Sequence, residues 1–187
     1  MEGEAALRGR VRPTAPILLT SKPMRVEIAK TIFLEGGYSD DPNDPGGETN
    51  FGISKRYHPN VDIKALTPEK AEEIYLKEYW NVLGCVDISS IRVRWKVFDI
   101  SVTSGQVTAA KMLQRSVKIS DDGHVGPITI KTVNRYLQSS IGEACIMSSL
   151  KEQHVKHFAQ DVVNNPHLIG DLMGLINRGF QGGDDLR

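Results

Sequence analysis

The segment LEGGYSDDPNDPGGETNFGIS, residues 34–54, constrains the fold more than any other part of the chain. It holds five acidic residues, five glycines and two prolines. Proline restricts φ and glycine permits positive φ, so the DDPNDPGG stretch cannot form regular secondary structure. The segment therefore predicts a sharp, ordered loop, followed by a short β-like run or hairpin in which Thr49, Phe51 and Ile53 share one side.

The residues before this loop predict an amphipathic helix that ends at Glu35. Apolar side chains recur at helical spacing from Val26 to Phe33, and two glycines then stop the pattern. A carboxyl group at the C-terminus of a helix feels the negative end of the helix dipole, and apolar neighbours reduce its hydration. Both effects disfavour the ionised carboxylate, as a general acid working near neutral pH requires. If the loop folds back, Asp44 and Thr49 come within reach of Glu35.

Two other interpretations of the acidic loop stay open beside the general acid. Carboxylates in a glycine-rich turn suit calcium, but prolines occupy ligand positions of a calcium loop that starts at Asp40 or Asp41, and no glutamate stands at the twelfth position. A solvated turn, whose Asp and Asn side chains bond to the local backbone, is the ordinary alternative. This alternative does not explain why Glu35 follows apolar residues and adjoins two glycines.

Most of the remaining chain predicts helices. The segment LTPEKAEEIYLKEYW, residues 66–80, offers Thr67 as an N-cap and Pro68 at the first helical position. Residues 91–104 fit a buried helix that Gly105 ends. Further helices are expected over VTAAKMLQRSV, PITIKTVNRYLQ, residues 142–163 and HLIGDLMGLINRGF. The predicted fold class is therefore mainly α, with a small β-hairpin.

Composition excludes several classes of protein. The chain has 23 basic and 23 acidic residues, so the basic excess of a nucleic-acid binder is absent. No apolar run approaches the ~20 residues of a membrane span, and none has the length of a signal-peptide core, so neither membrane insertion nor a signal peptide is expected. His154 and His157 lack the spacing of a zinc helix, so neither a metal nor a cofactor is predicted. Cys85 and Cys145 are expected to be buried free thiols.

In the stretch EGGYSDDPNDPGGETNFGIS the chain closely resembles the signature of glycoside hydrolase family 108, phage and bacterial lysozymes that act as N-acetylmuramidases. Later segments are similar to further landmarks of that family, in the same order: LKEYW, VFDISVTSG, LQRSVKISDDGHVGP and NRGF. The resemblance covers Met24 to about Phe180. It implies a lysozyme-like fold with the hairpin at the active cleft.

The resemblance also implies roles for individual residues. Glu35 would be the catalytic acid, and Asp44 would follow it after the eight-residue gap of phage-type lysozymes. Asp44 and Thr49 would position water or stabilise an oxocarbenium-like transition state, with Asp41 as a rival for the second polar role. Contacts with the sugar are predicted for Tyr38, Asp41, Asn50, Phe51 and Gln106.

The function implied by the resemblance is hydrolysis of the β-1,4 bond between N-acetylmuramic acid and N-acetylglucosamine in peptidoglycan, with lysis of the cell wall. Residues 1–23 are predicted to be a flexible leader, 24–105 a lysozyme-like catalytic region, and 106–187 a helical C-terminal lobe that is packed into the same unit and includes a peptidoglycan-binding region. A phage endolysin of this kind would be a monomer, stored in the host bacterial cytoplasm until release to the wall in the periplasm. The alternatives are a lytic transglycosylase on the same bond and a non-catalytic peptidoglycan-binding or virion structural protein.

Overall fold

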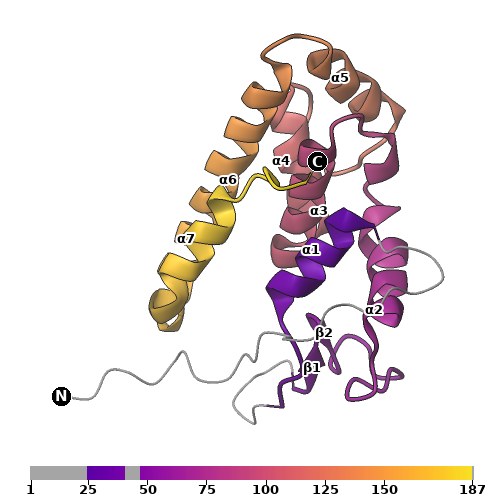
Figure 1. Ribbon diagram of the computed structural model, residues 1–187. Coiled ribbons are helices and arrows are strands. Elements are labelled where there is room, and N and C mark those ends of the chain that lie inside the picture. Colours follow the sequence, from indigo (N-terminus) through magenta and orange to yellow (C-terminus); the bar gives the residue numbers. More distant parts are fainter. Residues whose placement is uncertain (1–24, 41–46, 187) are drawn as a thin grey trace. The chain divides into compact units, whose positions relative to one another are not determined.

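The computed structural model describes residues 25–40 and 47–186 (Figure 1). The chain divides into two compact units, one ending at Leu76 and one starting at Lys77. In the described part, helices dominate and a two-stranded antiparallel sheet is the only sheet. The predicted class, mainly α with a small hairpin, is therefore confirmed. The predicted leader lies outside the described residues, and the predicted division between residues 105 and 106 stays a prediction.

The first unit consists of two helices and a hairpin. Its elements are α1 (Val26–Glu35), β1 (Thr49–Asn50), β2 (Ile53–Ser54) and α2 (Pro68–Tyr75). Figure 1 shows the hairpin beyond the C-terminal end of α1. The backbone N–H of Arg25 donates to a carboxylate oxygen of Glu72 at 2.8 Å, which ties the start of α1 to α2.

Helix α1 ends at Glu35, as predicted, and it buries only part of its apolar stripe. Ile28 and Ile32, four residues apart, are buried, whereas Val26 and Phe33 are exposed. Residues spaced by four lie one above the other on a helix, so Ile28 and Ile32 share the buried side. The residues that directly precede Ile28 and Ile32 are buried as well.

Helix α2 begins as its sequence predicts. The Thr67 hydroxyl accepts a hydrogen bond from the backbone N–H of Lys70 at 3.4 Å, and Pro68 occupies the first helical position, where its missing N–H costs nothing. The regular helix stops at Tyr75, and a π-helical turn, η1 (Leu76–Trp80), continues the chain. The predicted helix over residues 66–80 is thus present, with a change of geometry in its last turn.

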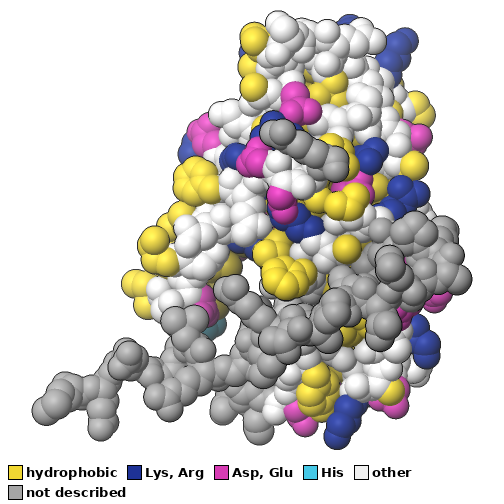
Figure 2. Space-filling model, in the orientation of Figure 1, with side chains coloured by type: hydrophobic (Ala, Val, Ile, Leu, Met, Phe, Trp, Pro, Cys, Tyr) yellow, Lys and Arg dark blue, Asp and Glu magenta, His cyan; other side chains and the backbone are white. Residues whose placement is uncertain are grey.

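The second unit is built around a buried helix. Its elements are η2 (Cys85–Asp87), α3 (Ile91–Ser104), α4 (Gln106–Ser116), α5 (Pro127–Leu137), α6 (Gly142–Asn164), η3 (Pro166–Asp171) and α7 (Leu172–Phe180). Helix α3 is buried around most of its circumference and packs against α4 and α6, and α6 packs against α7. Figure 2 shows exposed hydrophobic side chains over the region of α6 and α7. Trp80 meets Phe98 edge to face, with ring centroids 5.5 Å apart, so Trp80 is a core residue.

Three charged side chains from α3 and α7 form a buried network in this unit. The Asp99 carboxylate is fully buried and accepts hydrogen bonds from Nε and Nη2 of Arg178 at 3.0 and 2.7 Å. Nζ of Lys96, also fully buried, lies 3.6 Å from Asp99 and donates to the backbone carbonyl of Arg178 at 3.1 Å. Burial lowers the pKa of Lys96 to about 8. The network joins the end of α7 to the middle of α3.

Both cysteines are free, as predicted. Cys85 is buried, but Cys145 is exposed on α6, so the expectation that both thiols are buried was wrong for Cys145. Among the described residues, no helix combines the length and the apolar character needed to cross a bilayer.

Replacing Asp99 with Ala should destabilise the second unit by about 3–5 kcal/mol, because it leaves two buried cations without their carboxylate. The matched control is Asp121→Ala, since Asp121 pairs with Arg115 at 2.6 Å and both side chains are about half exposed. That change should cost less than about 1 kcal/mol. Denaturant unfolding followed by circular dichroism measures both. Equal losses would contradict a structural role for the buried network.

Candidate functional site

Glu35 is the last residue of α1, and the chain turns sharply after it. Gly36 has φ 84° and ψ −169°, a backbone region that is essentially restricted to glycine. A side chain at this position would therefore oppose the turn that ends the helix at Glu35. The Glu35 side chain is partly buried, and its Oε1 atom is shielded from solvent. The first of the two glycines after Glu35 is thus required by the backbone.

The loop after Glu35 is closed by backbone hydrogen bonds between Ser39 and Thr49. Each residue's N–H donates to the other's carbonyl oxygen at 2.8 Å. Thr49 also pairs with Ser54 across the hairpin, so β1 lies between the segment that follows Glu35 and strand β2. This arrangement brings the chain back beside the end of α1.

The hairpin turn consists of Phe51 and Gly52, and both residues have positive φ, at 52° and 77°. Two consecutive positive φ values are typical of the tight turns whose twist matches a β-hairpin, and the usual residues there are Asn and Gly. A phenylalanine in this conformation costs about 1–2 kcal/mol. Phe51, predicted from the sequence as a sugar contact, is therefore held in a strained backbone conformation at the tip of the hairpin.

Tyr75 holds this turn from the end of α2. Its hydroxyl donates to the carbonyl oxygen of Phe51 at 2.7 Å, and its side chain is almost completely buried. Gly52 lies against both Tyr75 and Glu35. A Cβ at position 52 would lie 2.5 Å from the Tyr75 hydroxyl oxygen and 2.7 Å from Cγ of Glu35. The turn, the tyrosine and the predicted acid are therefore in direct contact.

Neither the role of Tyr75 nor the contact of Gly52 with Glu35 was predicted from the sequence. Tyr75 is a buried core residue of α2. The available signal was the dipeptide Phe51-Gly52 between two short β segments, because a two-residue hairpin turn brings its backbone close to whatever lies beneath. No sequence signal connected the Tyr75 hydroxyl with that turn.

The remaining hairpin residues with predicted roles have partners within the first unit. The Thr49 hydroxyl donates to the carbonyl oxygen of Gly47 at 3.1 Å. The buried Asn50 amide donates to the carbonyl oxygens of Ile63 and Leu66 at 3.1 and 3.4 Å. Asn50 therefore anchors the segment that leads to α2. Its predicted contact with the sugar, and the catalytic role of Thr49, stay predictions.

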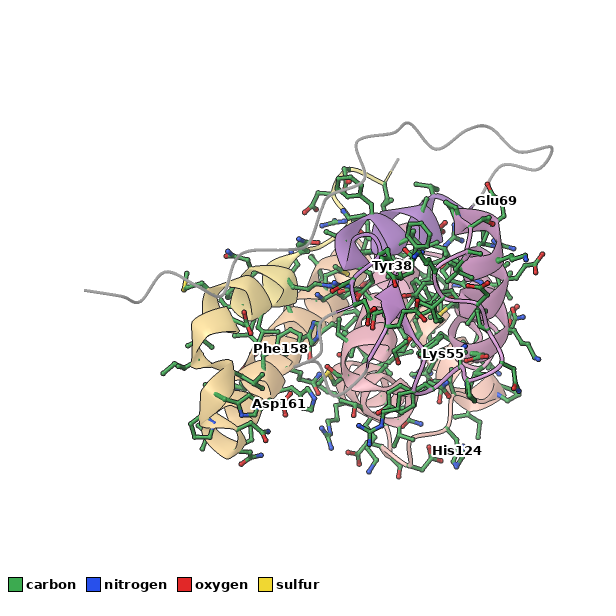
Figure 3. The ribbon with its side chains drawn as sticks, turned by 90° about the horizontal axis from the view of Figure 1, so that it is seen from below. Tyr38, Lys55, Glu69, His124, Phe158 and Asp161 are labelled. Carbon is green, nitrogen blue, oxygen red and sulfur yellow. The ribbon has the colours of Figure 1, made fainter. Side chains whose placement is uncertain are left out.

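Tyr38 lies at the start of the loop, and its ring is partly exposed (labelled in Figure 3). Its hydroxyl donates to Oε1 of Glu48 at 2.8 Å. This hydrogen bond to the carboxylate raises the pKa of Tyr38 to about 12. The phenol therefore stays protonated at physiological pH and braces one side of the loop against the other.

Three predicted site residues have no described position beside Glu35. Asp41 and Asp44 lie outside the described residues. Gln106, the first residue of α4, belongs to the second unit, where its amide donates to the carbonyl oxygen of Glu78 at 2.5 Å. The roles of Asp41, Asp44 and Gln106 stay predictions. Within residues 25–40 and 47–186, no three His, Cys, Asp or Glu side chains come together in a way that could hold a metal ion.

The DDGHVGP turn of the C-terminal lobe is organised by one buried glutamine. Nε2 of Gln114 donates to Oδ1 of Asp122 at 2.7 Å and to the carbonyl oxygen of His124 at 3.0 Å. Its Oε1 accepts from the N–H of Gly123 at 3.0 Å. The Gln114 amide thus stabilises the turn through hydrogen bonds. The predicted wall-binding role of this region stays a prediction.

Comparison with known proteins places these features in a family context. Residues 28–105 match the family model described as Glycosyl hydrolase 108. Among solved structures, SagA of Brucella abortus is similar to this chain, with 27% sequence identity and a TM-score of 0.63. The match covers 84% of this chain and 96% of SagA. A search of curated proteins found no match.

Replacing Glu48 with Gln should lower the pKa of Tyr38 from about 12 toward its ordinary value near 10, because the neutral amide no longer opposes the phenolate. Spectrophotometric titration of tyrosine measures the shift. The difference between each protein and its Tyr38→Phe counterpart isolates the signal of this residue. Tyr38 should ionise below pH 11 in the variant but not in the wild type. Identical titration curves would show that Glu48 does not hold the hydroxyl.

Proposed function

We propose that Glu35 is the general acid of this chain, a glycoside hydrolase that has a glycosyl hydrolase 108 region at residues 28–105 and acts on peptidoglycan as a lysozyme. In this proposal Glu35 protonates the glycosidic oxygen that leaves when the β-1,4 bond between N-acetylmuramic acid and N-acetylglucosamine breaks. The proposal rests on one observation: Glu35 ends α1 directly against the hairpin turn of the family motif. The proposed step needs no cofactor.

The surroundings of Glu35 support this role. Exclusion of water from the reacting groups strengthens the interaction of a general acid with the leaving oxygen. Oε1 of Glu35 is shielded from solvent, and the negative end of the α1 dipole lies at the same place. The carboxyl group is thus carried by the end of a helix, and a hairpin turn packs against it.

A second polar group has to deal with the positive charge that develops on the sugar ring, or to hold the attacking water. We assign this role to Asp44 or Asp41 together with Thr49. The Thr49 hydroxyl donates its hydrogen bond to the carbonyl oxygen of Gly47. Its oxygen therefore still has lone pairs that can accept a hydrogen bond from water. Thr49 would therefore orient a water molecule through that oxygen.

Two aromatic residues of the first unit suit the sugar itself. The C–H faces of a pyranose ring pack on aromatic rings, and Tyr38 follows the end of α1 while Phe51 lies in the hairpin turn. Tyr38 is partly exposed and is held in place by Glu48. We propose that these two rings contact the glycan on either side of the cleaved bond, with Asn50 keeping the hairpin in position.

Replacing Glu35 with Gln should lower the rate of peptidoglycan hydrolysis by about 10²–10⁴-fold, because the amide has the shape of the carboxyl group but no acidic proton. The matched control is Glu69→Gln, which removes a carboxylate from the start of α2 in the same unit (labelled in Figure 3) and should leave the rate unchanged. Digestion of purified peptidoglycan, with mass analysis of the soluble fragments, measures both.

The same digestion separates the alternatives. Hydrolysis leaves a reducing N-acetylmuramic acid end, whereas a lytic transglycosylase leaves a 1,6-anhydro-muramic end. Anhydro fragments from the wild type would replace hydrolysis with transglycosylation. Persistent clearing by Glu35→Gln would show that another group is the acid. If the wild type sedimented with the wall but released no fragments, the chain would be a binding protein.

We further propose an endolysin role, in which the enzyme is held in the bacterial cytoplasm and reaches the periplasmic wall through a separate membrane lesion. Bacteria that express the chain should keep growing until the inner membrane is permeabilised, and should then lyse. Cells that express Glu35→Gln should not lyse after the same treatment. Culture turbidity measures both. Lysis on expression alone, without permeabilisation, would contradict the need for a separate lesion.

A further inference from the structure

The Glu35 side chain lies where a side chain at position 52 would begin. A Cβ on residue 52 would lie 2.7 Å from Cγ and 3.0 Å from Oε2 of Glu35. Carbon atoms without a bond between them normally stay about 3.5–4.0 Å apart. The Glu35 side chain therefore occupies the space that any other residue at position 52 would need for its own side chain.

The Tyr75 hydroxyl also lies close to this point. It would lie 2.5 Å from that Cβ, and it donates to the carbonyl oxygen of Phe51 at 2.7 Å. A phenylalanine with positive φ tends to relax toward ordinary backbone angles. The hydrogen bond from Tyr75 opposes this relaxation, because it holds the carbonyl oxygen of Phe51 in the position that the turn demands.

We propose that the Phe51-Gly52 turn, clamped by the Tyr75 hydroxyl, is a positioning device that fixes the orientation of the Glu35 side chain. Tyr75 and Gly52 then act on the reaction through Glu35, without touching the substrate. The turn limits the rotamers that Cγ and Oε2 of Glu35 can adopt, so the proton is presented in one direction. This inference rests on the proposed role of Glu35 as general acid.

Two features of the first unit make the device specific. Tyr75 is the last residue of α2 and is only 1% exposed, so its hydroxyl cannot move away. The Asn50 amide anchors the strand before the turn to Ile63 and Leu66. The turn is therefore held on two sides, and its own strain is not free to relax.

The chain supplies a matched pair of glycines to test this. Gly52 and Gly47 have similar positive φ, at 77° and 68°, but a Cβ at position 47 would have no neighbour within 4 Å. An alanine at either position is equally strained in its backbone, and only the alanine at position 52 displaces Glu35. We expect Gly52→Ala to lower kcat on peptidoglycan about 100-fold or more, as misplacement of a reacting group by about 1 Å does. KM should change little, and Gly47→Ala should keep the wild-type kcat.

Tyr75→Phe provides the second variant, because it keeps the ring and removes only the hydroxyl. Its kcat should fall by about 10-fold, KM should stay near the wild-type value, and the alkaline limb of its pH–rate profile, along which the catalytic acid loses its proton, should shift. Melting temperatures of all variants show whether each remains folded. If Gly52→Ala does not fold, the split between kcat and KM in Tyr75→Phe decides the matter.

The outcomes separate this inference from the proposed function. Equal losses in Gly52→Ala and Gly47→Ala would show that only backbone strain matters, and full activity in Gly52→Ala or Tyr75→Phe would also overturn the positioning role. In either case a dead Glu35→Gln would leave the general acid in place. If instead Glu35→Gln were active, the general acid would be lost, whatever the glycine variants did.

Discussion

The buried carboxylate of Asp99 limits how the helices of the second unit can pack. A buried charge is tolerated only when partners surround it. Lys96 from the same helix and Arg178 from α7 supply them, and Lys96 also bonds to the backbone of Arg178. Helix α7 can therefore satisfy the charges of α3 in only one packing position, the one in which Arg178 reaches Asp99. A shift by one turn would leave Asp99 and Lys96 with incomplete partners.

The same network explains the state of a neighbouring histidine. His154 is fully buried, and its Nε2 lies 3.0 Å from the Thr103 hydroxyl. Burial, helped by the nearby charges of Lys96 and Arg178, lowers the pKa of His154 to about 2. The core already holds two cations for one carboxylate, and a third cation would have no compensation. His154 is therefore a neutral core residue.

In the first unit, backbone geometry rather than buried charge fixes the arrangement of the elements. Gly36 ends the helix at Glu35, and Gly52 lets a hairpin lie directly against that residue. Tyr75 then holds the strained turn with a single hydrogen bond. The two units thus differ in the interactions that fix their packing. Buried ion pairs do so in the second unit, and restricted backbone angles do so in the first.

Much of this was predictable from local patterns, because helix ends and turns depend on nearby residues. The end of α1 at Glu35, the Thr67 cap and the hairpin at residues 49–54 all follow from glycine, proline and capping chemistry. The contact between Tyr75 and Phe51 joins residues 24 positions apart, and the contact of Asp99 with Arg178 spans 79 positions. Such pairs depend on tertiary packing, which no local period encodes. For the same reason, the spacing of the apolar residues in α1 did not show which of them are buried.

The distribution of tryptophan has a practical consequence for anyone who follows unfolding of this protein by fluorescence. The chain has two tryptophans, Trp80 and Trp95. Both are fully buried, and both belong to the second unit. Intrinsic tryptophan emission therefore reports the core around α3 and contains no signal from the unit that carries Glu35. A protein whose hairpin had opened, but whose second unit was intact, would look native by that measurement. The state of the first unit has to be read by tyrosine absorbance, by circular dichroism or by activity.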